Sequence, residues 1–154
     1  MERVYFVCTG NTCRSQMAEA IFIEMAGQVK LDVQTRSAGV SAWPGQPASG
    51  QAVKVLGDMG IEWRGTSETA DEEFVREATL ILTMTGSHKR ILMERYPYAR
   101  DYIFTLKEFV DDNIEDQGRK NLDIEDPFGG SVADYRRTAD ELELAVKKLI
   151  KKLV

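Results

Sequence analysis

The residues best suited to chemistry lie in one short stretch, Cys8–Ser15 (CTGNTCRS). Cys8 can act as a nucleophile in its thiolate form. Arg14, six positions later, offers a planar fork of donors that matches two phosphate oxygens. Gly10 and Asn11 are residue types that tolerate left-handed backbone angles, which a tight turn of N–H groups around an anion requires. A nucleophile, an anion cradle and a bidentate clamp together suit attack on phosphorus through a phosphocysteine intermediate.

The elements on either side of this stretch favour the same chemistry. Val4–Cys8 (VYFVC) is a continuous apolar run, typical of a strand buried on both faces of a parallel sheet. A helical pattern follows over Ser15–Gly27. Ligands bind at the carboxyl ends of such strands, and a helix N-terminus favours an anion. We therefore expect a phosphate-binding loop after the first strand, and a depressed pKa for the Cys8 thiol.

A structural interpretation competes with this one. Taken alone, Cys8 would favour a packing role, because free cysteine is among the most buried residue types. The arginine six positions later and the strand-loop-helix setting reverse that preference.

Buried-strand patterns alternate with helical ones along the rest of the chain. The further predicted strands are Asp32–Ser37, Thr79–Met84 and Tyr102–Thr105. The further predicted helices are Gly50–Met59, Ser87–Arg95 and a long final helix that begins at a capping box of Ser131 and Asp134. The alternation predicts one α/β domain over residues 1–154, a central four-stranded parallel sheet with helices on both faces.

Composition excludes several classes of protein. With 43% hydrophobic residues among 154, the chain is neither disordered nor a collagen-like or coiled-coil rod. The 20 basic and 25 acidic residues give a net charge of -5, so binding of nucleic acid through a basic surface is not expected. No apolar run approaches the roughly 18 residues of a membrane span, and the first residues do not resemble a signal peptide. We expect a cytoplasmic protein with no membrane partner.

The titratable residues suited to metal binding are few. Cys8 and Cys13 are the two cysteines, and with the single histidine, His88, they fall short of the roughly four ligands of a zinc site. We expect no metal and no cofactor. In a reducing compartment the cysteine pair is chemical rather than structural. His88 is expected on a solvated helix face, without a role.

Three motifs resemble the low-molecular-weight protein-tyrosine phosphatase family: VCTGNTCRS at residues 7–15, Asp126-Pro127-Phe128 before the last helix, and Arg36–Gly39 after the second strand. The resemblance covers essentially the whole chain. It implies that Cys8 is the nucleophile, that residues 9–15 bind phosphate and that Arg14 clamps it. It also implies that the Ser15 hydroxyl supports the thiolate and that Asn11 holds the shape of the loop.

The remaining residues that match the family are a general acid and its neighbours. Asp126 matches the acid that protonates the leaving group and later activates water. A separate acid is needed because a thiolate cannot also donate the proton that the leaving atom requires. Thr9, Gly10, Thr12 and Cys13 match the remaining phosphate-binding positions.

The residue at position 12 bears on the substrate. Tyrosine-specific members carry a bulky aliphatic residue there, whereas Thr12 and Phe128-Gly129-Gly130 resemble the bacterial protein-arginine phosphatases. A guanidine leaves with a conjugate-acid pKa of about 12.5 or more, against about 10 for tyrosine, so it depends more on Asp126. Phe128 can stack on the guanidinium. We expect hydrolysis of phosphoarginine in proteins; the alternative is phosphotyrosine, with Thr12 incidental.

Two further features carry weaker expectations. Trp43 could form a wall of the cleft or pack in the core. The loop Val110–Asp126 holds seven acidic and two basic residues and could attract cationic peptides, although a solvated loop is the simpler interpretation.

Three rival functions share the loop chemistry. An arsenate reductase needs further cysteines beyond Cys13 to pass a disulfide outward, and the chain has none. A phosphocysteine carrier needs neither Arg14 nor Asp126. A phosphoprotein-binding module would not need both Cys8 and Asp126.

A redox hypothesis follows from the second cysteine. A thiolate oxidises readily, and Cys13 lies close enough in sequence to trap oxidised Cys8 as a disulfide, as relatives do.

Overall fold

The computed structural model describes residues 1–111 and 122–154. Its centre is a parallel sheet of four strands in the order β2-β1-β3-β4. The strands are β1 (Glu2–Cys8), β2 (Val33–Gly39), β3 (Leu80–Thr83) and β4 (Ile103–Thr105). The predicted α/β class and the four-stranded parallel sheet are confirmed.

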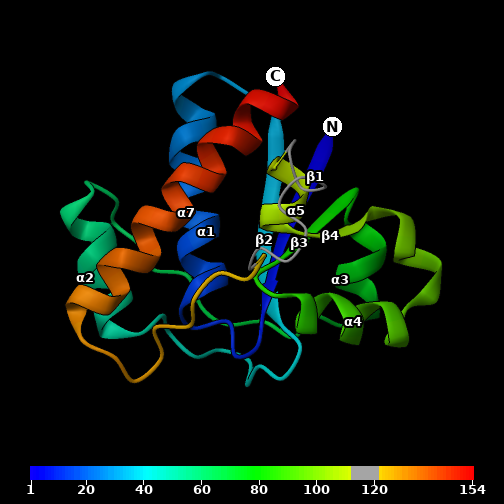
Figure 1. The fold of residues 1–154 in the computed structure, drawn as a ribbon, viewed down its shortest axis with the longest axis horizontal. Helices are drawn as coiled ribbons and strands as arrows, with labels where there is room; N and C mark the ends of the chain where they lie inside the picture. Colours follow the sequence, from blue (N-terminus) through cyan, green and yellow to red (C-terminus); the bar gives the residue numbers. More distant parts are fainter. Residues whose placement is uncertain (112–121) are drawn as a thin grey trace.

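Helices cover both faces of this sheet (Figure 1). On one side lie α1 (Arg14–Gln28), α2 (Gly50–Asp58) and α7 (Val132–Leu153); on the other lie α3 (Glu72–Glu77) and α4 (Gly86–Arg95). Two short elements flank β4, namely the 3-10 helix η1 (Pro97–Tyr102) and α5 (Leu106–Val110). The sequence did not predict α3, η1 or α5, because five or six residues are too few to display a helical period.

Strand β1 is the centre of the core. Its side chains alternate between the faces: Val4 and Phe6 belong to the cluster under α1 and α7, and Tyr5 and Val7 belong to the cluster on the opposite face. All four are completely buried. Burying each of these side chains contributes about 1.5–3 kcal/mol, so the continuous apolar run fixes the strand between two helical layers.

Helix α7 begins as predicted. The Ser131 hydroxyl accepts a hydrogen bond from the Asp134 N–H at 3.2 Å, and the Asp134 carboxylate accepts one from the Ser131 N–H at 2.9 Å. The apolar stripe of this helix, at spacings of three and four, is buried over Tyr135, Thr138, Leu142, Val146 and Leu149 and half-buried at Leu153. Most of the acidic loop predicted before this helix, residues 112–121, lies outside the described residues.

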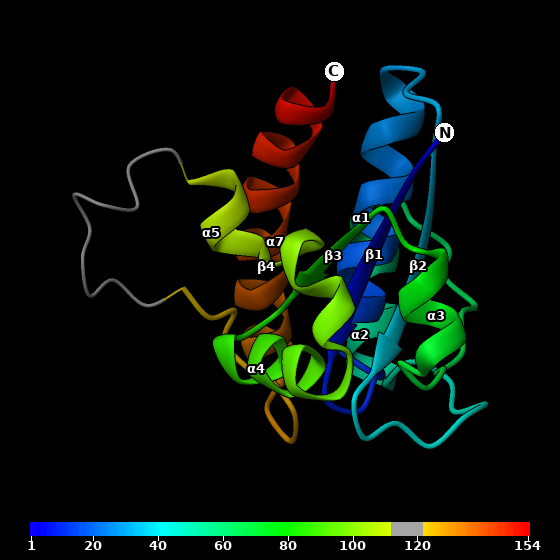
Figure 2. The ribbon, with the colours of Figure 1, turned by 90° about the vertical axis from the view of Figure 1, so that its right-hand side faces the viewer.

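The ends of β1 and β2 meet where the first loop begins. Cys8 pairs with Gly39, and the loops that follow are tied together because the Val40 and Ser41 N–H groups donate to the carbonyls of Cys8 and Thr9, both at 3.0 Å. A side chain at Gly39 would collide with the Thr9 carbonyl oxygen. Figure 2 shows the N and C labels at the opposite end of the sheet from this loop.

Replacing this glycine tests how closely the two loops must approach. We expect Gly39→Ala to lower the free energy of unfolding by about 2 kcal/mol and to reduce kcat, because a fixed backbone atom must move. Gly27→Ala is the matched control: a methyl group there would meet no other part of the chain within 4 Å, and alanine favours a helix by up to about 1 kcal/mol. Urea unfolding and steady-state kinetics measure both. Equal stability of Gly39→Ala and wild type would contradict the close approach.

Candidate active site

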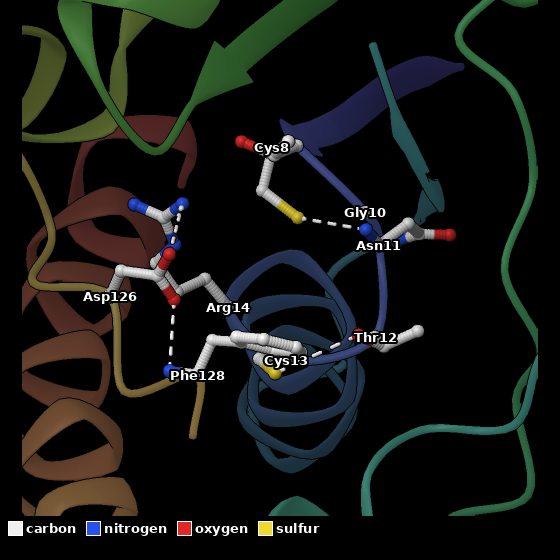
Figure 3. Close-up of a pocket in the computed structure, with 9 residues that line it drawn as sticks. Cys8, Gly10, Asn11, Thr12, Cys13, Arg14, Asp126 and Phe128 are labelled. Carbon is white, nitrogen blue, oxygen red and sulfur yellow. Dashed lines mark hydrogen bonds and ion pairs between the residues drawn. The ribbon is translucent and has the colours of Figure 1, made fainter. Parts of the chain in front are cut away.

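A cavity of about 270 Å³ opens at the carboxyl end of β1 (Figure 3). The residues that line it are Cys8, Thr9, Gly10, Asn11, Thr12, Cys13, Arg14, Asp126 and Phe128. The structure therefore brings Asp126 and Phe128, which precede α7, against the loop that follows β1. Of the predicted site residues, Trp43 and Ser15 do not line this cavity.

The Cys8 thiol receives two hydrogen-bonding groups at the base of the cavity. The Asn11 N–H donates to Cys8 Sγ at 3.2 Å, and the Ser15 hydroxyl lies 2.8 Å from the same sulfur. Asn11 has φ 58°, so the left-handed backbone predicted for this turn is present. The turn brings the N–H of the third residue after Cys8 back onto its sulfur.

The bonding of the Asn11 side chain fixes the direction of the Ser15 hydrogen. Asn11 Oδ1 accepts from the Glu68 N–H at 2.9 Å, so the amide nitrogen is the end that faces Ser15 Oγ at 2.7 Å and Ser37 Oγ at 2.9 Å. Since that nitrogen can only donate, Ser15 Oγ is its acceptor and the Ser15 hydrogen is left for Cys8 Sγ. Ser15 therefore stabilises the thiolate form of Cys8.

The pKa of Cys8 nevertheless differs from the sequence expectation. Burial is the largest influence and raises the pKa of the thiol above its usual value, while the Ser15 hydroxyl, the charge of Arg14 and the Asn11 N–H lower it. Burial outweighs these contacts, so the predicted depression is wrong for this enclosed sulfur. The sequence showed the donors but not how completely α1 and the sheet would cover Cys8, which is 3% exposed.

Arg14 and Asp126 form an ion pair in the wall of the cavity. Arg14 Nη2 lies 3.5 Å from Asp126 Oδ2, and Arg14 Nη1 donates to the Ile124 carbonyl at 3.0 Å. Arg14 is buried, whereas the Asp126 side chain is 53% exposed. The second Asp126 oxygen accepts from the Phe128 N–H at 3.0 Å. The carboxylate is thereby held at the mouth, where a leaving group would pass.

The segment that carries Asp126 is anchored on β3 and α4. The Ile124 N–H donates to the Met84 carbonyl at 2.8 Å, and the Gly86 N–H at the start of α4 donates to Asp123 Oδ1 at 2.9 Å. Asp126 is thus positioned by the contacts that Asp123 and Ile124 make with the residues at the junction of β3 and α4.

Sequence reasoning missed a pair of residues that support the loop from below. The Gln16 amide donates to the Asn11 carbonyl at 2.6 Å, and the Trp63 indole N–H donates to Gln16 Oε1 at 2.7 Å. Gln16 is completely buried. A polar residue in the first turn of a helix gave no signal of this contact, because its partner Trp63 is 47 positions away.

A third missed residue, Glu19 on α1, accepts a hydrogen bond from the Ser37 hydroxyl at 2.6 Å. Burial raises the pKa of Glu19 to about 7, the Ser37 hydroxyl lowers it, and the nearby charge of Glu68 raises it further. A carboxyl that titrates near neutral pH therefore lies two hydrogen bonds from Asn11.

Cys13 lies on the side of the cavity nearest α7. Its Sγ is 3.2 Å from the Tyr135 hydroxyl and 3.7 Å from Thr12 Oγ1, and both cysteines are free thiols. Burial, followed by the contact with Cys13, raises the pKa of Tyr135 to about 12. Tyr135 therefore remains a neutral hydroxyl beside the second thiol.

Two expectations are corrected. His88 is not on a solvated face: it is 4% exposed, and its Nε2 lies 2.8 Å from Thr9 Oγ1. The capping box that it forms with Thr85 was the sequence signal that could have placed it. Trp43 is 76% exposed, so it does not pack in the core and it does not line the cavity. Phe128 is also 76% exposed but stands at the cavity mouth as expected.

Within residues 1–111 and 122–154, no group of three or more histidine, cysteine or acidic side chains could hold a metal ion. None of the helices in that part of the chain is long and apolar enough to cross a membrane.

The chain is similar to known proteins along almost its whole length. A family model described as "Low molecular weight phosphotyrosine protein phosphatase" matches residues 3–154. A protein-arginine-phosphatase of Bacillus subtilis is 43% identical over 150 residues, which are 97% of this chain and 95% of that protein.

Two solved structures are similarly close. One is a mutant of the YwlE arginine phosphatase with a phosphorylated active site serine (42% identity, TM-score 0.90, 98% of this chain and 95% of that one). The other is a low molecular weight protein tyrosine phosphatase from T. tengcongensis (45% identity, TM-score 0.89, 99% of each chain).

Removing the Ser15 hydroxyl tests how the sulfur is stabilised. We expect Ser15→Ala to raise the pKa of Cys8, seen as a shift to higher pH in the rate of iodoacetamide alkylation, and to lower kcat/KM about tenfold. Ser131→Ala is the control: it loses a helix cap, about 1 kcal/mol of stability, far from the sulfur. An unchanged alkylation profile in Ser15→Ala would contradict the deduced direction of the hydrogen bond.

Proposed function

The chain belongs to the low molecular weight phosphotyrosine protein phosphatase family, and we propose that it hydrolyses phosphoarginine in proteins through a phosphocysteine intermediate. The observation that carries the proposal is a single cavity that contains the Cys8 thiol, the Arg14 guanidinium and the Asp126 carboxyl, with Thr12 at its rim. Its partners would be arginine-phosphorylated proteins. The free thiols of Cys8 and Cys13 suit a reducing compartment, so the cytoplasm is the proposed location.

In the first step, Cys8 attacks phosphorus as a thiolate. The S–P bond forms while the bond between phosphorus and the arginine nitrogen breaks, and the protonated carboxyl of Asp126 gives its proton to that nitrogen. The loop N–H groups and Arg14 bind the equatorial phosphoryl oxygens. The Ser15 hydrogen supports the sulfur before it attacks.

In the second step, water replaces the sulfur on phosphorus. The Asp126 carboxylate, left without its proton by the first step, accepts one from the attacking water. The S–P bond breaks, the Cys8 thiolate is restored, and inorganic phosphate leaves. The exposure of Asp126 at the mouth suits both tasks, because a leaving group and a water molecule reach it from the same side.

Three features favour arginine over tyrosine as the leaving group. A guanidine is the poorer leaving group and gains more from an acid, and Asp126 can also attract its charge. Phe128 presents an exposed ring on which a planar guanidinium can stack. Thr12 is small and polar. The named function of the Bacillus subtilis relative supports the same substrate.

Phosphotyrosine is the second candidate substrate. It is favoured by the similarity to the T. tengcongensis protein, which is named a tyrosine phosphatase and is as close in sequence as the arginine phosphatases. In that case Thr12 would be incidental.

The deciding measurement is kcat/KM on phosphoarginine and phosphotyrosine peptides of identical sequence. We expect wild type to prefer phosphoarginine at least tenfold, and Thr12→Ile to lose or invert that preference by filling the space beside the leaving group. Cys8→Ser should show no turnover, and Asp126→Asn should slow phosphoarginine more than phosphotyrosine. A preference of wild type for phosphotyrosine would favour the second substrate, and turnover by Cys8→Ser would exclude the phosphocysteine route.

We also propose that the cysteine pair protects the nucleophile from irreversible oxidation. Peroxide converts the Cys8 thiolate to a sulfenic acid, and the Cys13 thiol displaces its hydroxyl as water to form a disulfide, which added thiol reduces. We expect wild type to recover its activity with dithiothreitol after peroxide, and Cys13→Ser to recover much less. Complete recovery of Cys13→Ser would contradict this proposal. So would a mass spectrum of peroxide-treated wild type that lacks the loss of two hydrogens expected for a disulfide.

A further inference from the structure

His88 is the single histidine of the chain, and the reaction described above does not use it. It lies at the third position of α4 and is 4% exposed. Its ring bridges two groups: Nδ1 lies 3.2 Å from the Thr85 backbone nitrogen, and Nε2 lies 2.8 Å from Thr9 Oγ1. One side chain thus joins the start of α4 to the residue that follows the nucleophile.

These contacts fix which ring nitrogen carries the hydrogen. The Thr85 backbone N–H can only donate, so Nδ1 is an acceptor and the hydrogen of a neutral ring is on Nε2. Nε2 then donates to Thr9 Oγ1. The Thr9 oxygen keeps one lone pair for another donor, and its rotation is restrained by the histidine.

The ring is uncharged at neutral pH. Burial is the main cause, and with the charge of Arg14 it lowers the pKa of His88 to about 4, although Asp123 and Asp126 oppose this. A neutral donor fixes the Thr9 hydroxyl without adding positive charge beside a cationic group in the cavity.

Thr9 stands at the rim of the cavity rather than at its base. The residues of the base, Cys8, Asn11 and Arg14, are buried, whereas Thr9 is exposed and Thr12 is half-buried. A side chain at the rim faces the group attached to phosphorus, and the buried base faces the phosphoryl oxygens. Both rim threonines are therefore placed to contact the leaving group.

We infer that Thr9, held by His88, is a second specificity determinant beside Thr12, and that its hydroxyl oxygen accepts a hydrogen bond from the guanidinium of phosphoarginine. His88 is a positioning residue for this contact. The inference rests on the proposed function. A guanidinium carries N–H donors around its plane, whereas the ring of phosphotyrosine has none to offer to Thr9, so the contact discriminates between the two substrates.

The test measures kcat/KM on the two matched peptides for a set of variants. Thr9→Val removes the hydroxyl at constant shape. His88→Asn keeps an acceptor for the Thr85 N–H but is too short to reach Thr9, whereas His88→Gln keeps the acceptor and places an N–H donor near Thr9. Thr79→Val is the matched control for loss of a threonine hydroxyl, because Thr79 precedes β3 at the end of the sheet away from the cavity.

We expect Thr9→Val and His88→Asn each to lower kcat/KM for phosphoarginine about five- to tenfold and for phosphotyrosine less than about twofold. The double variant should lose no more than either single variant, because both remove one contact. His88→Gln should recover most of the activity, and Thr79→Val should match wild type. Imidazole ¹⁵N NMR of wild type should show the hydrogen on Nε2.

Two results would overturn the inference alone: equal losses on both peptides, which would make the pair a structural support, or additive losses in the double variant. In either case wild type would still prefer phosphoarginine, and the proposed function would stand. A wild-type preference for phosphotyrosine would instead overturn the proposed function and the inference together.

Discussion

The geometry of the site depends on how Asn11 is held in a left-handed backbone conformation. Its N–H reaches Cys8, its carbonyl is held by Gln16, and its side-chain amide joins Ser15, Ser37 and the Glu68 N–H. An asparagine that satisfies all of these groups while completely buried leaves the turn little freedom. Because this amide donates to Ser15 Oγ, the Ser15 hydroxyl hydrogen points to Cys8 Sγ and stabilises the nucleophile.

A second set of contacts positions the Glu68 N–H, which donates to the Asn11 side chain. Arg36 lies over the rings of Tyr5 and Phe74 and pairs with Glu68 at 2.5 Å, so the backbone that donates to Asn11 is fixed by an arginine on β2. A second arginine, Arg14, draws in the segment that carries Asp126. The nucleophile and the acid, distant in sequence, are thus positioned by separate arginines, Arg36 on β2 and Arg14 at the start of α1.

Local pattern explains what could be predicted from the sequence. Apolar continuity revealed β1, and the spacing of Cys8 and Arg14 revealed the loop, because both are properties of neighbouring residues. The site of His88 and the support from Gln16 and Trp63 arise from contacts across 47 to 79 positions, which periodicity does not record. The pKa of Cys8 was misjudged for the same reason: its donors are local, but the layers that bury it are not.

The buried carboxyl of Glu19 links the stability of the fold to proton uptake. Its pKa rises from 4.5 in the unfolded chain to about 7 in the folded one, so between these values the folded chain binds the extra proton. The contribution of Glu19 to stability, on the order of 3 kcal/mol, is complete below pH 4.5 and is lost progressively as the pH rises from there through about 7. Ionisation of the Cys8 thiol, in contrast, increases as the pH rises. The protonation state that best holds the loop together and the one that best arms its nucleophile therefore lie at different pH, and the neutral range is a compromise between them.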